Sequence, residues 1–223
     1  MASCSKLSAL LILIVTLVGA FAPAHAQEDK NKPYFLVATN KLTDSIFEES
    51  VVLMLPVTQS PIVEGIIINK PTEMPVKKLL PKAVLKNQAA TAYFGGPVDL
   101  TEPSVLIRAS KAPSSASALL EDVYSMTDAT AIAHLLKNPA PAQDLRFFIG
   151  RSRWTEDQLR AETFEGSWYS MPAETSYVFS ANPKSVWSTL VQRGQLQKAS
   201  VERRSFTGDF AMLTFSASTA APY

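Results

Sequence analysis

The residues best suited to bind a ligand in this sequence each follow an apolar run that is typical of a β-strand. They are Asn69 with Lys70, Gly95 with Gly96, and Arg151. Because the ends of neighbouring parallel strands lie at one edge of a sheet, we predict that these segments meet. That edge would offer an amide, an ammonium, a guanidinium and backbone N–H groups exposed by the glycines, which together suit a carboxylate or a phosphate.

Each of these residues also has a structural interpretation. Asn69 can cap the element that follows it, and Gly95-Gly96 before Pro97 can simply bend the chain at a strand end. Lys70 and Arg151 can be solvated surface charges. The prediction of a small anionic ligand therefore depends on whether the segments share one pocket.

Common catalytic motifs are missing from the sequence, which has no G-x-S-x-G, no phosphate-binding P-loop and no H-E-x-x-H. His134 lies on an expected helix, where packing is its usual role. The adjacent pair Glu48-Glu49 is expected to point to different faces of a strand and so not to converge on a substrate. We assign no catalytic residue. The enzymatic alternative is a hydrolase, which requires groups such as Ser50, Asp44, Asn69 and His134 to share a cleft.

The N-terminus has the three parts of a secretory signal peptide. Lys6 precedes an uncharged run from Leu7 to Phe21, and Ala24-His25-Ala26 follows as a cleavage site. We predict a signal peptide over residues 1–26 and a periplasmic or secreted location. The alternative is an uncleaved anchor helix, since a bilayer needs about 20 apolar residues. After cleavage we expect no membrane span.

Composition excludes several classes of function for residues 27–223. This part has no cysteine and keeps His134 as its histidine, so we expect no disulfide, metal site or cofactor. The whole chain has 21 basic and 20 acidic residues, which does not favour nucleic-acid binding. The length fits one domain, with a core over about 34–194 and a loose tail after 216.

Residue patterns predict strands in the first half of this domain and alternating strands and helices in the second. Asp128 and Thr155 are expected helix N-caps, and Gly194 is expected to end the helix that opens at Asn182-Pro183. This alternation favours a mixed sheet. We expect strands near 34–39, 50–55, 64–69, 90–94, 104–107, 123–126, 146–149, 177–180 and 210–215, and helices over 74–80, 128–137, about ten residues after Trp154, and 182–194.

Several segments between Tyr34 and Trp187 recur in the order and spacing of a known family. They are Phe35-Leu36-Val37-Ala38, Leu42-Thr43-Asp44 with Phe47 and Ser50, Asn69-Lys70-Pro71-Thr72, Phe94-Gly95-Gly96-Pro97-Val98, and Gly150 with Trp154, Gln158 and Leu159. The sequence thereby resembles the AlgH/YqgE family, also called UPF0301. The resemblance implies a single compact α+β domain, with a mixed, partly barrel-like β-sheet and helices packed outside it. Asp44, Ser50, Trp154 and Gln158 are the family-motif residues.

The resemblance implies little about activity, because the family is largely uncharacterised. With the signal sequence and no nucleophile–base pair in view, we predict an exported, non-catalytic binding or interaction domain. Its partner would be a protein or a small anionic ligand. A hydrolase is the alternative, and the transcriptional-regulator label attached to the family is the least favoured, because export separates the chain from the chromosome.

Overall fold

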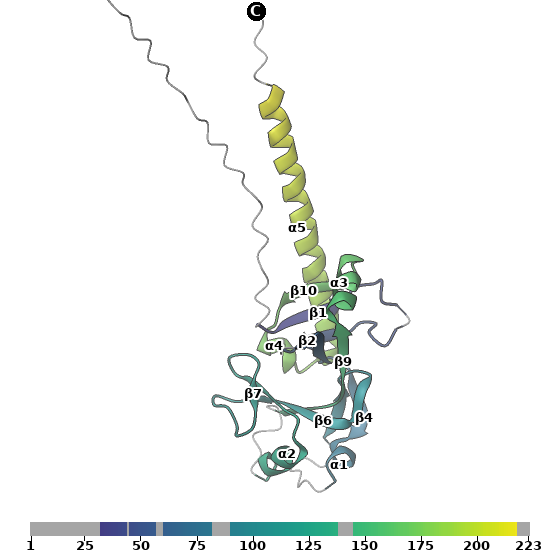
Figure 1. Ribbon diagram of the computed structural model, residues 1–223, viewed down its shortest axis with the longest axis vertical. Coiled ribbons are helices and arrows are strands. Elements are labelled where there is room, and N and C mark those ends of the chain that lie inside the picture. The colour runs from purple at the N-terminus through teal and green to yellow at the C-terminus, as the bar shows by residue number, and fades with distance from the viewer. Residues whose placement is uncertain (1–31, 44, 57–59, 82–89, 138–144, 218–223) are drawn as a thin grey trace, which may run out of the picture.

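The computed structural model describes residues 32–43, 45–56, 60–81, 90–137 and 145–217, so the expected signal peptide and Asp44 lie outside the described residues. Within this part the chain forms a mixed, curled sheet with helices around it (Figure 1). The strands are β1 Tyr34–Ala38, β2 Val51–Met54, β3 Ile62–Ile67, β4 Pro71–Pro75, β5 Thr91–Phe94, β6 Val98–Arg108, β7 Ser117–Ala118, β8 Val123–Met126, β9 Leu145–Thr155 and β10 Trp168–Pro172. The helices are α1 Val76–Leu79, α2 Ala129–Leu135, α3 Glu156–Phe164, α4 Thr175–Val178 and α5 Pro183–Ala217.

The long strand β9 connects the two halves of the sheet. Among the described residues the strand order is β10-β1-β2-β3-β9-β6-β8-β7, and β5 with β4 branches from β9. The C-terminal end of β9 pairs antiparallel with β3, and its N-terminal part pairs antiparallel with β6 and parallel with β5. β9 thus pairs with three strands. As a result, ends of β3, β5 and β6 lie next to the middle of β9.

Alternation along β1 separates two apolar cores. Phe35 and Val37 pack on the side of α4 and α5, where they meet Leu190. Leu36 and Ala38 point to the opposite face, in a cluster that includes Leu159 of α3. Successive side chains of a strand face opposite sides, so one short apolar run supplies both cores. A third core lies between β6, β8 and the helices α1 and α2.

Two of the expected helix starts are confirmed. The Asp128 side chain accepts a hydrogen bond from the Ala131 backbone N–H at the start of α2. Thr155 Oγ1 accepts one from Gln158 N at 3.1 Å and caps α3. These bonds satisfy N–H groups that the first turn of a helix leaves without partners, which is why the sequence signal was reliable.

The end of the chain differs from the expectation. Residues 177–180 do not form a strand, because the helix α4 occupies Thr175–Val178 and buries Val178. Residues 210–215 belong to α5, and a short apolar run alone does not distinguish strand from helix. Gly194 does not end the helix, which continues to Ala217, and residues 218–223 of the tail expected after 216 lie outside the described residues. A Cβ on Gly194 would lie 2.6 Å from the ring of Tyr169, so glycine here serves packing.

Further differences concern β4 and β9. Residues 74–80 were expected to be helical, but only Val76–Leu79 form a helix, and β4 precedes it. The strand expected at 146–149 continues to Thr155. Gly150 adopts φ +70°, so the chain passes through a left-handed residue inside the strand and continues beyond it.

Candidate functional site

Asn69 is a buried structural residue that follows β3 and contacts the start of β2. Its Oδ1 accepts a hydrogen bond from Val51 N at 2.8 Å, and its Nδ2 donates to the Glu49 carbonyl at 2.8 Å. The side chain is 6 % exposed, and the two bonds use its acceptor and one donor. Asn69 therefore fixes the turn that precedes β2.

Lys70 lies beside that turn in a polar cleft, which we call the Lys70 cleft. Its Nζ donates to the Ile46 carbonyl at 2.7 Å. Burial lowers the pKa of Lys70, although Glu48 and Glu49 act in the opposite direction. The cleft has a volume of about 620 Å³ and is lined by Ser45, Glu48, Glu49, Asn69, Lys70, Pro71 and Lys184.

The two glutamates of this cleft correct an expectation from the sequence. Glu48 and Glu49 were expected on opposite faces of a strand, but they lie in a turn, and both line the Lys70 cleft. Glu49 has φ +52°, a left-handed conformation that breaks strand alternation. No sequence pattern indicated this, because the conformation is held by Asn69, twenty residues away in the chain.

The glycines meet the middle of β9 at what we call the glycine junction, formed by Gly95, Gly96, Gly150, Arg151 and Ser152. Gly95 N donates to the Ile149 carbonyl at 2.8 Å. A Cβ on Gly95 would lie 2.4 Å from the Gly150 oxygen, and one on Gly96 would lie 2.3 Å from the Arg151 carbonyl carbon. No side chain fits between these backbones, so the glycines permit the close approach of two strands.

The side chain of Arg151 extends from this junction and forms a network of ion pairs. Its guanidinium lies 3.5 Å from Glu64, 3.3 Å from Asp99 and 3.1 Å from Glu102, and its side chain is 17 % exposed. Arg153 also pairs with Glu64 and Asp99. The positive charge of Arg151 is already surrounded by carboxylates of its own chain.

The structure thus brings the predicted segments together but points their side chains apart. Phe94 N donates to the Lys70 carbonyl at 2.8 Å, and Ile67 N donates to the Gly95 carbonyl at 2.9 Å. Asn69 and Lys70 line the Lys70 cleft, whereas Gly96 and Arg151 do not. Ligand binding at these residues stays a prediction. Lys70 is the residue among them that lines a cleft without a carboxylate partner in the described part of the chain.

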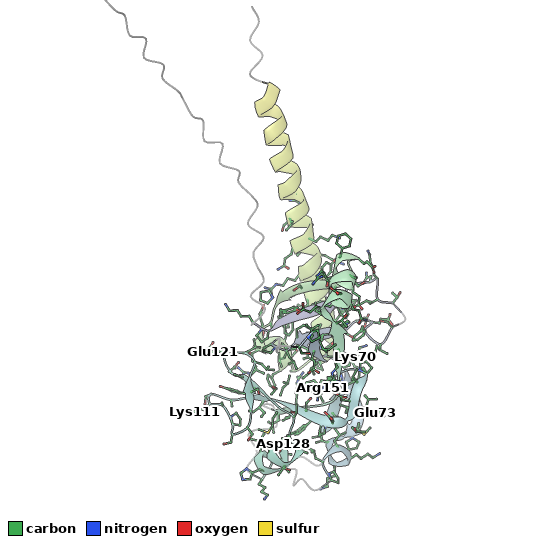
Figure 2. The ribbon with its side chains drawn as sticks, viewed as in Figure 1. Lys70, Glu73, Lys111, Glu121, Asp128 and Arg151 are labelled. Atoms are coloured by element: carbon green, nitrogen blue, oxygen red, sulfur yellow. The ribbon has the colours of Figure 1, made fainter. Side chains whose placement is uncertain are left out.

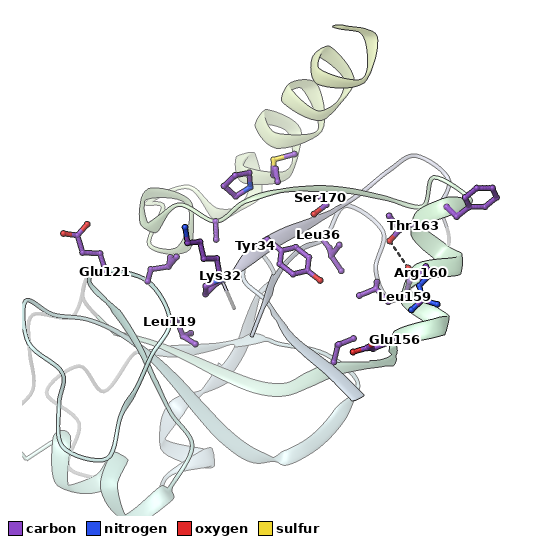
Figure 3. Close-up of a pocket in the computed structure, with 17 residues that line it drawn as sticks. Lys32, Tyr34, Leu36, Leu119, Glu121, Glu156, Leu159, Arg160, Thr163 and Ser170 are labelled. Atoms are coloured by element: carbon purple, nitrogen blue, oxygen red, sulfur yellow. Dashed lines mark hydrogen bonds between the residues drawn. The ribbon is translucent and has the colours of Figure 1, made fainter. Parts of the chain in front are cut away.

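An apolar groove was not indicated by any motif. It has a volume of about 980 Å³ and lies on the face of β1 and β10, between α3 and the turn at residues 119–121 (Figure 3). Leu36, Leu159 and Met171 are among its lining residues, and Phe164 stands at its rim with 93 % of its surface exposed. The available signal was the apolar alternation of β1, which places Leu36 on the face that lines the groove.

The family-motif residues that the structure describes have structural contacts. Trp154 is 3 % exposed and packs against Phe47 and Trp168, with ring centroids 5.3 and 6.0 Å apart. Gln158 lies on α3, where its Nε2 is 3.4 Å from Glu162 Oε1. Ser50 is fully buried, and its Oγ has no hydrogen-bond partner in the described part of the chain. The structure offers no physical account of that unpaired hydroxyl.

The groups required for a hydrolase do not converge in the described residues. His134 is exposed on α2 and lines neither the Lys70 cleft nor the apolar groove. Ser50 is buried and Asn69 is committed to backbone groups. Among the described residues no group of three His, Cys, Asp or Glu side chains is placed to hold a metal ion.

Sequence comparison decides the family. A family model described as AlgH-like matches residues 35–199. The chain belongs to this family. A UPF0301 protein of Thermobifida fusca is 31% identical over 166 residues, which cover 71% of this chain and 84% of that protein. A UPF0301 protein of Cytophaga hutchinsonii is 29% identical over 185 residues, covering 82% and 93%.

The AlgH-like fold expected from the resemblance is confirmed by a solved structure. The solution structure of AlgH from Pseudomonas aeruginosa superimposes with a TM-score of 0.62 at 22% identity, covering 75% of this chain and 90% of AlgH. The shared fold is a single α+β domain with a half-barrel sheet. Within the residues described, none of the helices is both long and apolar enough to span a membrane.

Proposed function

We propose that this AlgH-like protein is an exported, non-catalytic binding domain whose ligand site is the apolar groove. The observation that supports binding is the groove itself, a concave and mainly apolar surface of about 980 Å³. Small-molecule sites commonly enclose about 300 to 1,000 Å³ and are lined largely by apolar side chains. The ligand is therefore an apolar small molecule.

Support for a non-catalytic role comes from the residues around the groove. Its polar lining residues include Thr163, whose hydroxyl donates to the Leu159 carbonyl at 2.8 Å, and Arg160, which pairs with Asp157 at 2.8 Å. Neither arrangement provides a nucleophile next to a base. A groove in which these two polar side chains are engaged within α3, and whose lining is mainly apolar, is suited to hold and orient a ligand.

Binding is tested with a neutral fluorescent probe, N-phenyl-1-naphthylamine, titrated against the purified domain. We expect saturable binding that weakens in Phe164→Ser, because this ring stands at the rim and its removal leaves the core intact. The matched control is Leu196→Ser, since Leu196 is also exposed, at 72 %, but lies on α5 outside the groove. Equal effects of the two substitutions, or no saturable binding, would contradict the proposed site.

Export is tested separately by fusing residues 1–30 to a reporter enzyme that is active only outside the cytoplasm. The run of uncharged residues Leu7–Phe21 and the Ala24-His25-Ala26 site support export. Reporter activity with loss of the N-terminal segment is the expected result. Retention in the cytoplasm would remove the argument for export and restore the regulator hypothesis.

A further inference from the structure

The Lys70 cleft contains charges of both signs that are not paired with one another. Burial lowers the pKa of Lys70 and the charges of Glu48 and Glu49 only partly offset this, and in the described part of the chain neither carboxylate comes within ion-pair distance of an amine. Lys184, on the first turn of α5, lines the same cleft and forms no ion pair with any residue that the structure describes. This differs from Arg151, which has three carboxylates within 3.5 Å.

The backbone of the turn that carries the two glutamates is held in place by Asn69 and Lys70. Asn69 holds the Glu49 carbonyl and the Val51 N–H, and Lys70 Nζ holds the Ile46 carbonyl. Both ends of the turn that carries the glutamates are therefore tied to residues 69 and 70. A site whose charged groups sit on a fixed backbone loses less entropy when a ligand binds.

The N-terminus of α5 adds to the positive side of the cleft. The helix begins at Pro183 and is 35 residues long, so the backbone N–H groups of its first turn carry a partial positive charge. Lys184 lies in that turn, and the carboxylates come from the turn before β2. The cleft thus presents a cationic part, formed by Lys70 and by Lys184 in the first turn of α5, and an anionic part, formed by Glu48 and Glu49.

We propose that the Lys70 cleft binds a small zwitterion of the free amino-acid type, with the ligand carboxylate on Lys70 and Lys184 and the ligand ammonium on Glu48 and Glu49. A purely anionic ligand would be repelled by the glutamates, and a purely cationic one by the lysines. A zwitterion satisfies both sets at once. The volume of about 620 Å³ accommodates a molecule of this size. This site shares no lining residue with the apolar groove and does not depend on it.

The test compares leucine with its two halves by NMR titration of the domain. The halves are 4-methylpentanoate, which lacks the ammonium, and 3-methylbutylamine, which lacks the carboxylate. We expect leucine to bind at least about tenfold more tightly than either half, which corresponds to about 1.4 kcal/mol for the added charge pair. Equal binding of 4-methylpentanoate, or no saturable shift with leucine up to its solubility limit, would overturn the proposal.

Variants locate the binding in the cleft. Lys70→Met and Glu48→Gln are each expected to weaken leucine binding about tenfold. Lys184→Met tests the same carboxylate contact at an exposed residue. The matched control is Lys111→Met, an exposed lysine between β6 and β7 that is well separated from Lys70 (Figure 2). Leucine binding that survives in both Lys70→Met and Glu48→Gln would overturn the assignment, as would an equal loss in the control.

Discussion

The glycine junction and the Lys70 cleft are neighbours in the fold, but among the described residues the charged side chains are paired at the junction and unpaired in the cleft. At the junction Arg151 is enclosed by Glu64, Asp99 and Glu102. In the cleft, Lys70 and the carboxylates beside it stay unpaired in the part of the chain that the structure describes. A cationic residue in a sequence motif is thus no indication of a ligand site until its partners are known.

Backbone pairing explains the difference. In the ladders of β9, Glu64 of β3 lies opposite Arg153 and diagonally across from Arg151, and Asp99 follows Val98, the residue of β6 opposite Arg151. Cross-strand neighbours have Cβ atoms about 5 Å apart, so opposite charges there pair with one another. The glutamates of the cleft lie in a turn, which has no such ladder. Charged side chains on paired strands form ion pairs with one another, whereas charged side chains in a turn can remain unpaired and face a cleft.

The largest expected effect tests the residue that connects the two regions. Trp154 lies on β9 just beyond the junction and packs on Phe47, which belongs to the turn that carries Glu48 and Glu49. Trp154→Ala should lower the free energy of unfolding by about 3 to 5 kcal/mol, because a buried indole leaves a large cavity. Chemical denaturation measures this. Unchanged stability with lost ligand binding would instead place Trp154 in a binding site.

A second substitution tests whether the junction is purely a packing device. Gly150→Ala should cost about 2 to 4 kcal/mol, because its φ of +70° strains any other residue and its Cβ would lie 2.2 Å from the Gly96 carbonyl oxygen. The matched control is Gly166→Ala, which has φ +79° but 3.4 Å to its nearest neighbour. Similar losses for both glycines, measured by denaturation, would show that backbone strain alone matters and that close strand approach does not.

A third substitution asks whether Asn69 belongs to the scaffold or to the site. Asn69→Ala should cost about 1 to 3 kcal/mol, because the buried Val51 N–H then lacks an acceptor. It should also weaken leucine binding, since the Glu49 turn loses its support. Full stability with impaired binding would mean that the amide contacts the ligand and that its bonds to the backbone are incidental.

The sequence predicted those features, helix caps and short strands, that depend on residues close together in the chain. The caps at Asp128 and Thr155 and the strands around Leu36 and Val52 depend on residues close in the chain, and the structure confirms them. Gly194 shows the limit of this reasoning. The space that it leaves is used by Tyr169, from a strand distant in sequence, so the same residue that often ends a helix lies inside one.

The site was harder to predict, because it depends on contacts between distant segments. The backbones near residues 70, 95–96 and 151 do lie close together, but not at the ends of parallel strands as expected: Arg151 lies inside β9, and β3 pairs antiparallel with that strand. The direction of each side chain was not accessible, since Glu64, Asp99 and Glu102 lie far from Arg151 in the chain. The apolar groove was missed for a similar reason: whether α3 covers all of the β1 face is a matter of tertiary packing.

The smallest expected effect is a pH dependence of the unfolding free energy, whose direction shows whether Lys70 is unpaired or paired with a carboxylate. Burial lowers the pKa of Lys70 below 10.5, so the folded protein releases this proton at a lower pH than the unfolded chain does. The ammonium therefore destabilises the fold at neutral pH, and wild-type stability relative to Lys70→Met should rise as the pH increases from the folded pKa towards 10.5. The measurement is the difference between the unfolding free energies of the two proteins, which cancels the titration of every other group that both share. A difference that falls over this range would mean that Glu48 or Glu49 stabilises the charged amine more than burial destabilises it, and the Lys70 cleft would then be paired internally, as Arg151 is.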